Sequence, residues 1–175
     1  MTLPSNFSDT EFWLRGSVPD VPALLQPAAH ALLQSKKEIY LYTKDFSKDL
    51  LWEKPFGRAS VGFHMQHMTG VLNRMLTYAE EKSLSNDQFD YLKNEGNPEN
   101  GITVEKLVEQ FNNEVEVALQ YFKQILESSL TEIRTVGRKK LPSTVIGLLF
   151  HAAEHSQRHA GQLLVTVSIL NGDKI

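Results

Sequence analysis

Apolar residues recur every three or four positions over four long stretches of the chain, which is the repeat of an α-helix with one buried face. The stretches cover about residues 21–45, 60–82, 103–128 and 143–170, and we predict a helix over each. Alternation with a period of two is absent, so no strand is predicted and the fold class is all-α. In the third stretch the apolar stripe consists of Val104, Leu107, Val108, Phe111, Val115, Ala118, Leu119, Phe122 and Leu126.

Capping and turn residues mark where the predicted helices begin and end. Thr103 and Ser143 are expected to cap the third and fourth helices. The long connection at 83–101 contains a short helical turn at about 88–93, and 129–142 is interpreted as an irregular segment with a basic turn. Four long helices with one short and one long connection fit a four-helix bundle, in which sites are built from side chains on facing helices.

Length and composition limit the classes of protein that the chain can belong to. Its 175 residues are expected to form one domain, spanning 1–175, and with 41% hydrophobic and 22% charged residues it is typical of soluble globular proteins. A net charge of -3 provides no basic excess for nucleic acid. The absence of cysteine excludes disulfides, thiol nucleophiles and cysteine-containing zinc sites. Any metal must therefore be held by His, Asp, Glu and water.

No targeting or membrane segment is expected. Residues 1–7 lack the basic and apolar regions of a secretory signal. No window approaches the roughly 18 apolar residues of a transmembrane helix. We therefore expect a cytoplasmic protein with no membrane partner.

Three of the six histidines lie four residues apart, at His151, His155 and His159. At about 100° per residue, positions four apart return to the same helix face, so the three imidazoles share one stripe. The outer two are about 12 Å apart along the axis, and at most two of the three can bind one ion. Since catalytic zinc usually has three protein ligands, a third must come from the second helix, where His64 and His67 are the candidates.

Other polar and apolar residues near the histidines are interpreted as structural rather than catalytic. Glu154 precedes His155, so the His-Glu-x-x-His pattern of zinc proteases is not matched. Arg74 and Arg158 are interpreted as salt-bridge residues rather than substrate contacts. Core packing is expected for Phe63, Met65, Met68, Met75 and Phe150.

Two segments carry a resemblance to a known family. Residues 155–162, His-Ser-Gln-Arg-His-Ala-Gly-Gln, resemble the His-x3-His-x-Gly-Gln signature of the DinB/YfiT-like superfamily, and residues 67–74 resemble its upstream histidine-containing helix. The similarity spans nearly the whole chain. It implies a four-helix bundle of up-down-down-up topology, a homodimer, and a divalent ion held by three histidines.

Carried over by position, the ligands implied by the resemblance are His67, His155 and His159. His64 and His151 then lie one turn away, as partners of the ligands or as substrate contacts. The metal would be zinc or nickel, with iron and manganese as further candidates, because imidazole suits several divalent ions.

The resemblance implies an enzyme acting on a small-molecule substrate, either a metal-dependent hydrolase or a transferase acting with a low-molecular-weight thiol. The thiol would have to come from outside this cysteine-free chain. His151 is the expected catalytic group, as a general acid or base. The alternative is a non-catalytic, stress-associated bundle with a structural ion, which a fourth protein ligand such as His64 or His151 would favour.

Overall fold

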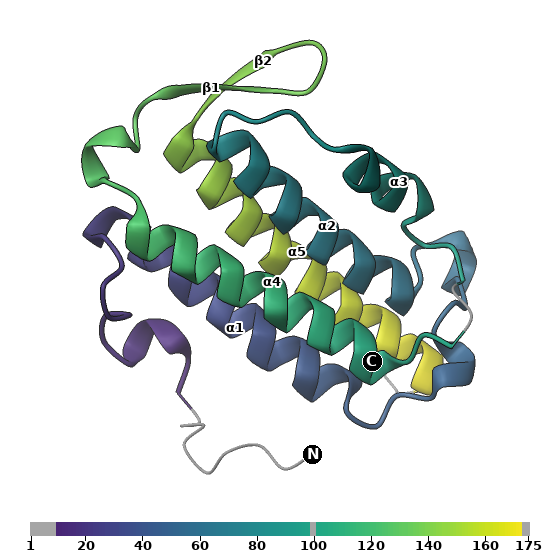
Figure 1. The fold of residues 1–175 in the computed structure, drawn as a ribbon. Coiled ribbons are helices and arrows are strands. Elements are labelled where there is room, and N and C mark those ends of the chain that lie inside the picture. Colours follow the sequence, from purple (N-terminus) through teal and green to yellow (C-terminus); the bar gives the residue numbers. More distant parts are fainter. Residues whose placement is uncertain (1–9, 99–100, 173–175) are drawn as a thin grey trace.

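Four long helices pack side by side in the computed structural model, which describes residues 10–98 and 101–172 (Figure 1). They are α1 (Gln26–Thr43), α2 (Val61–Ala79), α4 (Val104–Gln124) and α5 (Val145–Asn171). Both α5 and α4 contact α1 and α2, so each helix packs against two others. In Figure 1, α1 and α5 run in one direction and α2 and α4 in the other. The predicted helical class is confirmed. Residues 1–7, where no secretory signal is expected, lie outside the described ranges.

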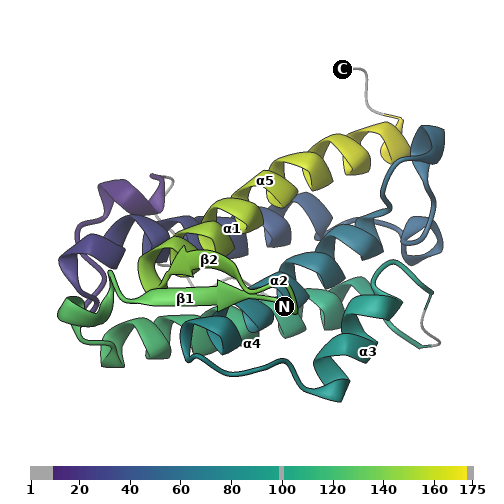
Figure 2. The ribbon, with the colours of Figure 1, turned by 90° about the horizontal axis from the view of Figure 1, so that it is seen from above.

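Short elements connect the long helices. The long connection between α2 and α4 contains α3 (Asn86–Asn94), which packs against α2 and lies outside the four long helices (Figures 1 and 2). Ser85 caps α3 in a complete capping box with Gln88. The structure also contains short 3-10 turns, which are η1 (Phe12–Leu14), η2 (Ala23–Leu25), η3 (Lys48–Leu50), η4 (Pro55–Gly57) and η5 (Glu127–Ser129).

Hydroxyl side chains fix the starts of the three later long helices. Ser60 accepts a hydrogen bond from the backbone N–H of Phe63, and Thr103 accepts one from Lys106, as a polar N-cap does. The cap of α5 is Thr144, whose side chain accepts from the N–H of Gly147. The prediction of Ser143 as this cap was wrong by one residue, because α5 begins at Val145 and the hydroxyl next to its first turn is that of Thr144, the last residue of a strand.

That strand is part of a hairpin, so the prediction of no strand was also wrong. Strand β1 (Ile133–Val136) pairs antiparallel with β2 (Leu141–Thr144) between α4 and α5. The turn is possible because Gly137 has a φ of +67°, which a residue without a Cβ adopts readily. Arg134 ties the hairpin to the bundle by donating from Nε to the carbonyl oxygen of Ala79 at 2.8 Å.

The core lies between the four long helices. Met65 and Met68 are fully buried in it, as predicted, whereas Phe150 is 60% exposed. The prediction for Phe150 was wrong because its position on α5 faces outward. Across 10–98 and 101–172, no helix is long and apolar enough to span a membrane. The largest fully buried side chains include Leu25, Leu32, Ile39, Leu72, Leu107, Phe111, Phe122 and Leu149.

Candidate metal centre

Helices α2 and α5 pack along each other and bring three imidazoles together. His67 comes from α2, and His155 and His159 come from α5 one turn apart. One ring nitrogen from each lies within 4.8 Å of the others, and Nε2 of His67 is 2.9 Å from Nε2 of His155. Imidazole nitrogens that bind one zinc ion lie about 2.0–2.1 Å from it, and therefore about 3.3 Å apart in a tetrahedral site. The spacing of the three side chains suits a single divalent ion.

His64 lies beside this cluster but is not part of it. Its side chain is buried, with Nδ1 at 2.9 Å from Nδ1 of His159 and Nε2 at 3.5 Å from the hydroxyl of Thr166. Because His64 occupies Nδ1 of His159, Nε2 of His159 is the nitrogen left for an ion. The structure thus brings both α2 histidines against the α5 histidines, His67 within the group of three and His64 behind it.

His151 lies one turn before the cluster, at its edge. Its side chain is 46% exposed, and its ring centroid is 5.1 Å from that of His155. His151, Glu154 and His155 form a second group with ligand spacing. Glu154, however, is bound by the guanidinium of Arg158, which offsets the charge that a cation would need. The group containing His67 is therefore the better candidate for a metal site.

Burial favours the neutral form of the imidazoles of His64, His155 and His159. It lowers the pKa of His64 and of His155 from 6.5 to about 4, and the charge of His67 adds to both effects. Burial, followed by the charges of His67 and His155, lowers the pKa of His159 to about 3. Arg158 contributes further to the lowered pKa of His155 and His159. Neutral imidazole is the form that binds metal, so His155 and His159 can each offer a ring nitrogen to an ion near pH 7.

The hydrogen-bonding pattern of the cluster also fits a cation. His67 must donate from Nδ1 to the carboxylate of Glu95, at 2.5 Å, because an ionised carboxylate only accepts. Nε2 of His67 therefore presents a lone pair to Nε2 of His155. Nδ1 of His155 is buried and, within the part of the chain that the structure describes, has no hydrogen-bond partner. With the single proton of neutral His155 on this Nδ1, its Nε2 also carries a lone pair, and a divalent ion between the two Nε2 atoms would satisfy both lone pairs.

Glu95 is the site residue that the sequence analysis missed. It follows the last residue of α3, and its side chain is only 4% exposed. Its carboxylate binds His67 and also accepts from Nη1 of Arg74 at 2.7 Å. The salt-bridge interpretation of Arg74 agrees with this contact. No sequence pattern in the connection at 83–101 indicates that Glu95 contacts His67, because the two residues are 28 positions apart. Phe63 stacks on the His67 ring, with centroids 5.1 Å apart.

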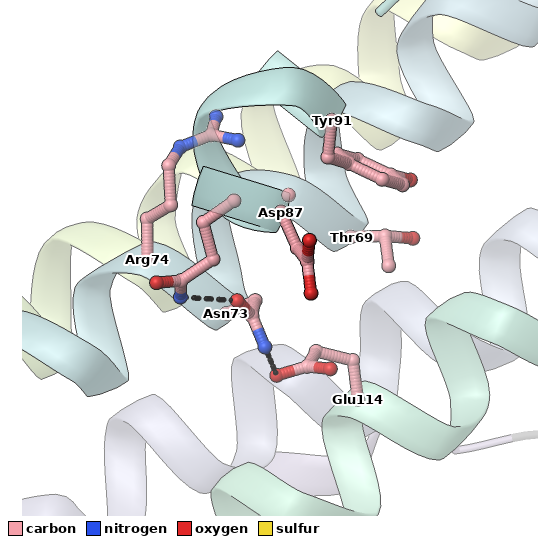
Figure 3. Close-up of a pocket in the computed structure, with 8 residues that line it drawn as sticks. Thr69, Asn73, Arg74, Asp87, Tyr91 and Glu114 are labelled. Carbon is pink, nitrogen blue, oxygen red and sulfur yellow. Dashed lines mark hydrogen bonds between the residues drawn. The ribbon is translucent and has the colours of Figure 1, made fainter. Parts of the chain in front are cut away.

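Two cavities lie near the cluster, and His67, His155 and His159 are not among the residues that line them. One, of about 500 Å³, is lined by His64 and Thr166 together with Arg58, Arg158 and Gln162. The other, of about 240 Å³, lies between α2, α3 and α4, where Arg74, Tyr91, Asp87 and Glu114 surround it (Figure 3). Burial raises the pKa of Glu114, which accepts a hydrogen bond from Asn73. The larger cavity is lined by His64, which contacts His159.

Comparison with known proteins gives a family and a fold. A family model described as the DinB superfamily matches residues 31–163. Among solved structures, the crystal structure of a conserved protein from Enterococcus faecalis superposes with a TM-score of 0.66 at 17% sequence identity. The match covers 85% of this chain and 97% of the other, and at this identity it shows a shared fold alone. No curated protein sequence matches the chain.

Proposed function

The chain belongs to the DinB superfamily, and from this premise we propose that it is a metal-dependent enzyme in which His67, His155 and His159 hold one divalent ion. The convergence of these three imidazoles supports the proposal. Among the described residues, their group contains no fourth protein ligand. A structural zinc is normally closed by four protein ligands, whereas a catalytic one keeps an open position. A set of three therefore favours an enzyme over a structural ion.

The donor set indicates the kind of metal. Three neutral imidazoles suit borderline ions, so zinc and nickel come first, with iron and manganese as further candidates. Such an ion acts as a Lewis acid toward an oxygen or sulfur atom of a substrate. In this proposal the residues of this chain hold the ion, and burial keeps the ligands His155 and His159 neutral.

The substrate in this proposal is a small molecule that enters the cavity of about 500 Å³ beside His64. A volume of this order is typical of small-molecule sites. The reaction is either hydrolysis or transfer to a low-molecular-weight thiol. Because the chain has no cysteine, the thiol would enter as a second substrate rather than come from the protein.

Elemental analysis of the protein, purified without a histidine tag, tests the proposal. We expect about one divalent ion per chain, retained through gel filtration and removed by a chelator. The metal found is then used in esterase, amidase and thiol-transfer screens, with the chelated protein as the blank. A protein that remains metal-free after incubation with zinc and nickel would contradict the proposal. Stoichiometric metal with a closed shell of four protein ligands would favour the structural ion.

His151 is proposed as the general acid or base of the reaction. Its half-exposed ring lies beside His155 but outside the ligand group, so it can carry a proton without binding the ion. The His151→Gln variant is expected to lose about 100-fold or more in turnover, because a positioned acid or base contributes on that order. Its metal content should be unchanged.

The matched control for His151 is His30→Gln. His30 lies on α1 and contacts the carbonyl oxygen of Gly16 at 2.9 Å, away from the cluster. This variant should turn over at the wild-type rate. Wild-type turnover in His151→Gln, measured with the metal content verified, would remove His151 from the mechanism.

A further inference from the structure

We infer that Glu95 is a positioning residue for the metal centre, holding the His67 imidazole in the tautomer whose Nε2 faces His155. This inference rests on the proposed function, since it concerns a ligand of the proposed ion. Two contacts fix the carboxylate: Oε2 lies 2.5 Å from Nδ1 of His67, and Oε1 accepts from Arg74 at 2.7 Å.

Burial makes these contacts strong. The side chains of Glu95 and Arg74 are 4% and 7% exposed, so little water competes for them. Glu95 forms an ion pair with the guanidinium of Arg74. An ionised carboxylate can only accept, so the ring proton of His67 is held on Nδ1. The other nitrogen, Nε2, is then unprotonated and 2.9 Å from Nε2 of His155.

The segment that carries Glu95 is tied to α2 next to His67. The backbone N–H of Gly96 donates to the side-chain oxygen of Gln66 at 2.7 Å. The hydroxyl of Tyr91 donates to the carbonyl oxygen of the same Gln66 at 3.1 Å. Burial and the charge of Glu95 raise the pKa of Tyr91 to about 12, so its hydroxyl keeps its proton. Glu95 is therefore held from both sides, with Tyr91 before it and Gly96 after it in the chain.

Gly70 is a separate indication that α2 is shaped to receive this carboxylate. A Cβ at position 70 would collide with Oε1 of Glu95 and would lie 2.5 Å from Nη1 of Arg74. The lack of a side chain allows the ion pair to lie directly on the helix, one turn after His67. Arg74 of this ion pair and the neighbouring Tyr91 also line the cavity in Figure 3.

A carboxylate behind a histidine ligand has a known physical effect. It fixes the ring tautomer and orientation and makes the ligating nitrogen more basic, and losing it typically weakens metal binding 10- to 100-fold. Glu95 acts on the ion through His67. It is outside both groups of side chains that have ligand spacing among the described residues.

The Glu95→Gln variant tests the inference by two readouts. Zinc affinity of the metal-free protein, measured against a chelating dye, is expected to fall about 10- to 100-fold. Nitrogen-15 shifts of the His67 ring in the metal-free protein report the tautomer directly, and should show Nδ1–H in the wild type and a mixture in Glu95→Gln. The tautomer readout needs no metal, and a merely structural role would not change it.

Matched variants show whether the changes in zinc affinity and in the His67 tautomer are due to the loss of the Glu95 carboxylate. Glu109→Gln removes an exposed carboxylate that pairs with Lys106 on α4, and should change neither readout. Gly70→Ala should act in the same direction as Glu95→Gln, because its Cβ displaces the carboxylate. Since Glu95→Gln leaves Arg74 buried without a counter-ion, the double variant Glu95→Gln, Arg74→Gln is the form to use if the single one does not fold.

The outcomes distinguish the inference from the function on which it rests. If the wild type binds no zinc, the proposed function fails, whatever the tautomer. If the wild type binds zinc and the Glu95 variants retain its affinity and the Nδ1–H tautomer, only the inference is overturned.

Discussion

Replacing His155 or His159 with alanine is expected to abolish stoichiometric binding of a divalent ion. The two residues are the pair that a single helix presents at a four-residue spacing, and both lie in the group of three with His67. Removing either leaves two imidazoles, which is fewer protein ligands than a catalytic zinc site normally has. Metal content by elemental analysis should fall from about one ion per chain to near zero.

The α2 histidines provide the discriminating controls. His67→Ala should lose the metal as completely as the α5 variants. His64→Ala should retain it with about 10- to 100-fold weaker affinity, because His64 contacts the ligand His159 rather than the proposed ion. Full metal retention in both His155→Ala and His159→Ala would eliminate the site. Retention in His67→Ala with loss in His64→Ala would exchange the roles of these two residues.

The sequence predicted the long helices because each buries one face over many turns. The stripe from Val104 to Phe122 repeats along all of α4, and its starting cap at Thr103 was predicted correctly. The hairpin had no comparable signal. Its strands have four residues each, none of which is buried, and the apolar Ile133 and Leu141 are exposed, so apolar residues do not alternate with polar ones along them.

The sequence predicted the part of the candidate site whose residues lie close together along the chain. His155 and His159 share a helix, so their spacing alone indicates one face. The choice between His64 and His67 depends on how α2 crosses α5, and residue spacing does not encode that crossing. The structure places each of the two against a different α5 histidine. Glu95 reaches the site only through the path of the connection after α3, which no local pattern specifies.

Acidification from pH 6.5 to 5 is expected to destabilise the metal-free protein. The pKa of His64 and His155 is about 4, and that of His159 about 3, against 6.5 for an ordinary histidine. Below pH 6.5 the unfolded chain binds protons at these positions and the folded chain does not. Stability therefore rises with pH across this window, is fully present above 6.5, and is lost as the pH falls.

The size of the effect follows from the number of groups. Each fully buried histidine contributes at most about 1.4 kcal/mol per pH unit in this window. His155 is partly exposed, so solvent screening reduces its share. We expect the free energy of unfolding to fall by about 3 to 4 kcal/mol between pH 6.5 and 5, a large part of a typical domain's stability. Urea denaturation of the chelated protein at several pH values measures it.

A variant of His64 tests whether the pH dependence of the free energy of unfolding arises from the buried histidines. His64 is buried behind His159 and faces Thr166, so His64→Gln keeps a polar group of similar reach while removing one titrating ring. The pH dependence of its unfolding free energy should decrease by about one proton, roughly a third of the total. A free energy of unfolding that is constant between pH 5 and 6.5 in the wild type would contradict the burial of neutral imidazoles. An unchanged slope in His64→Gln would mean that the proton uptake arises elsewhere.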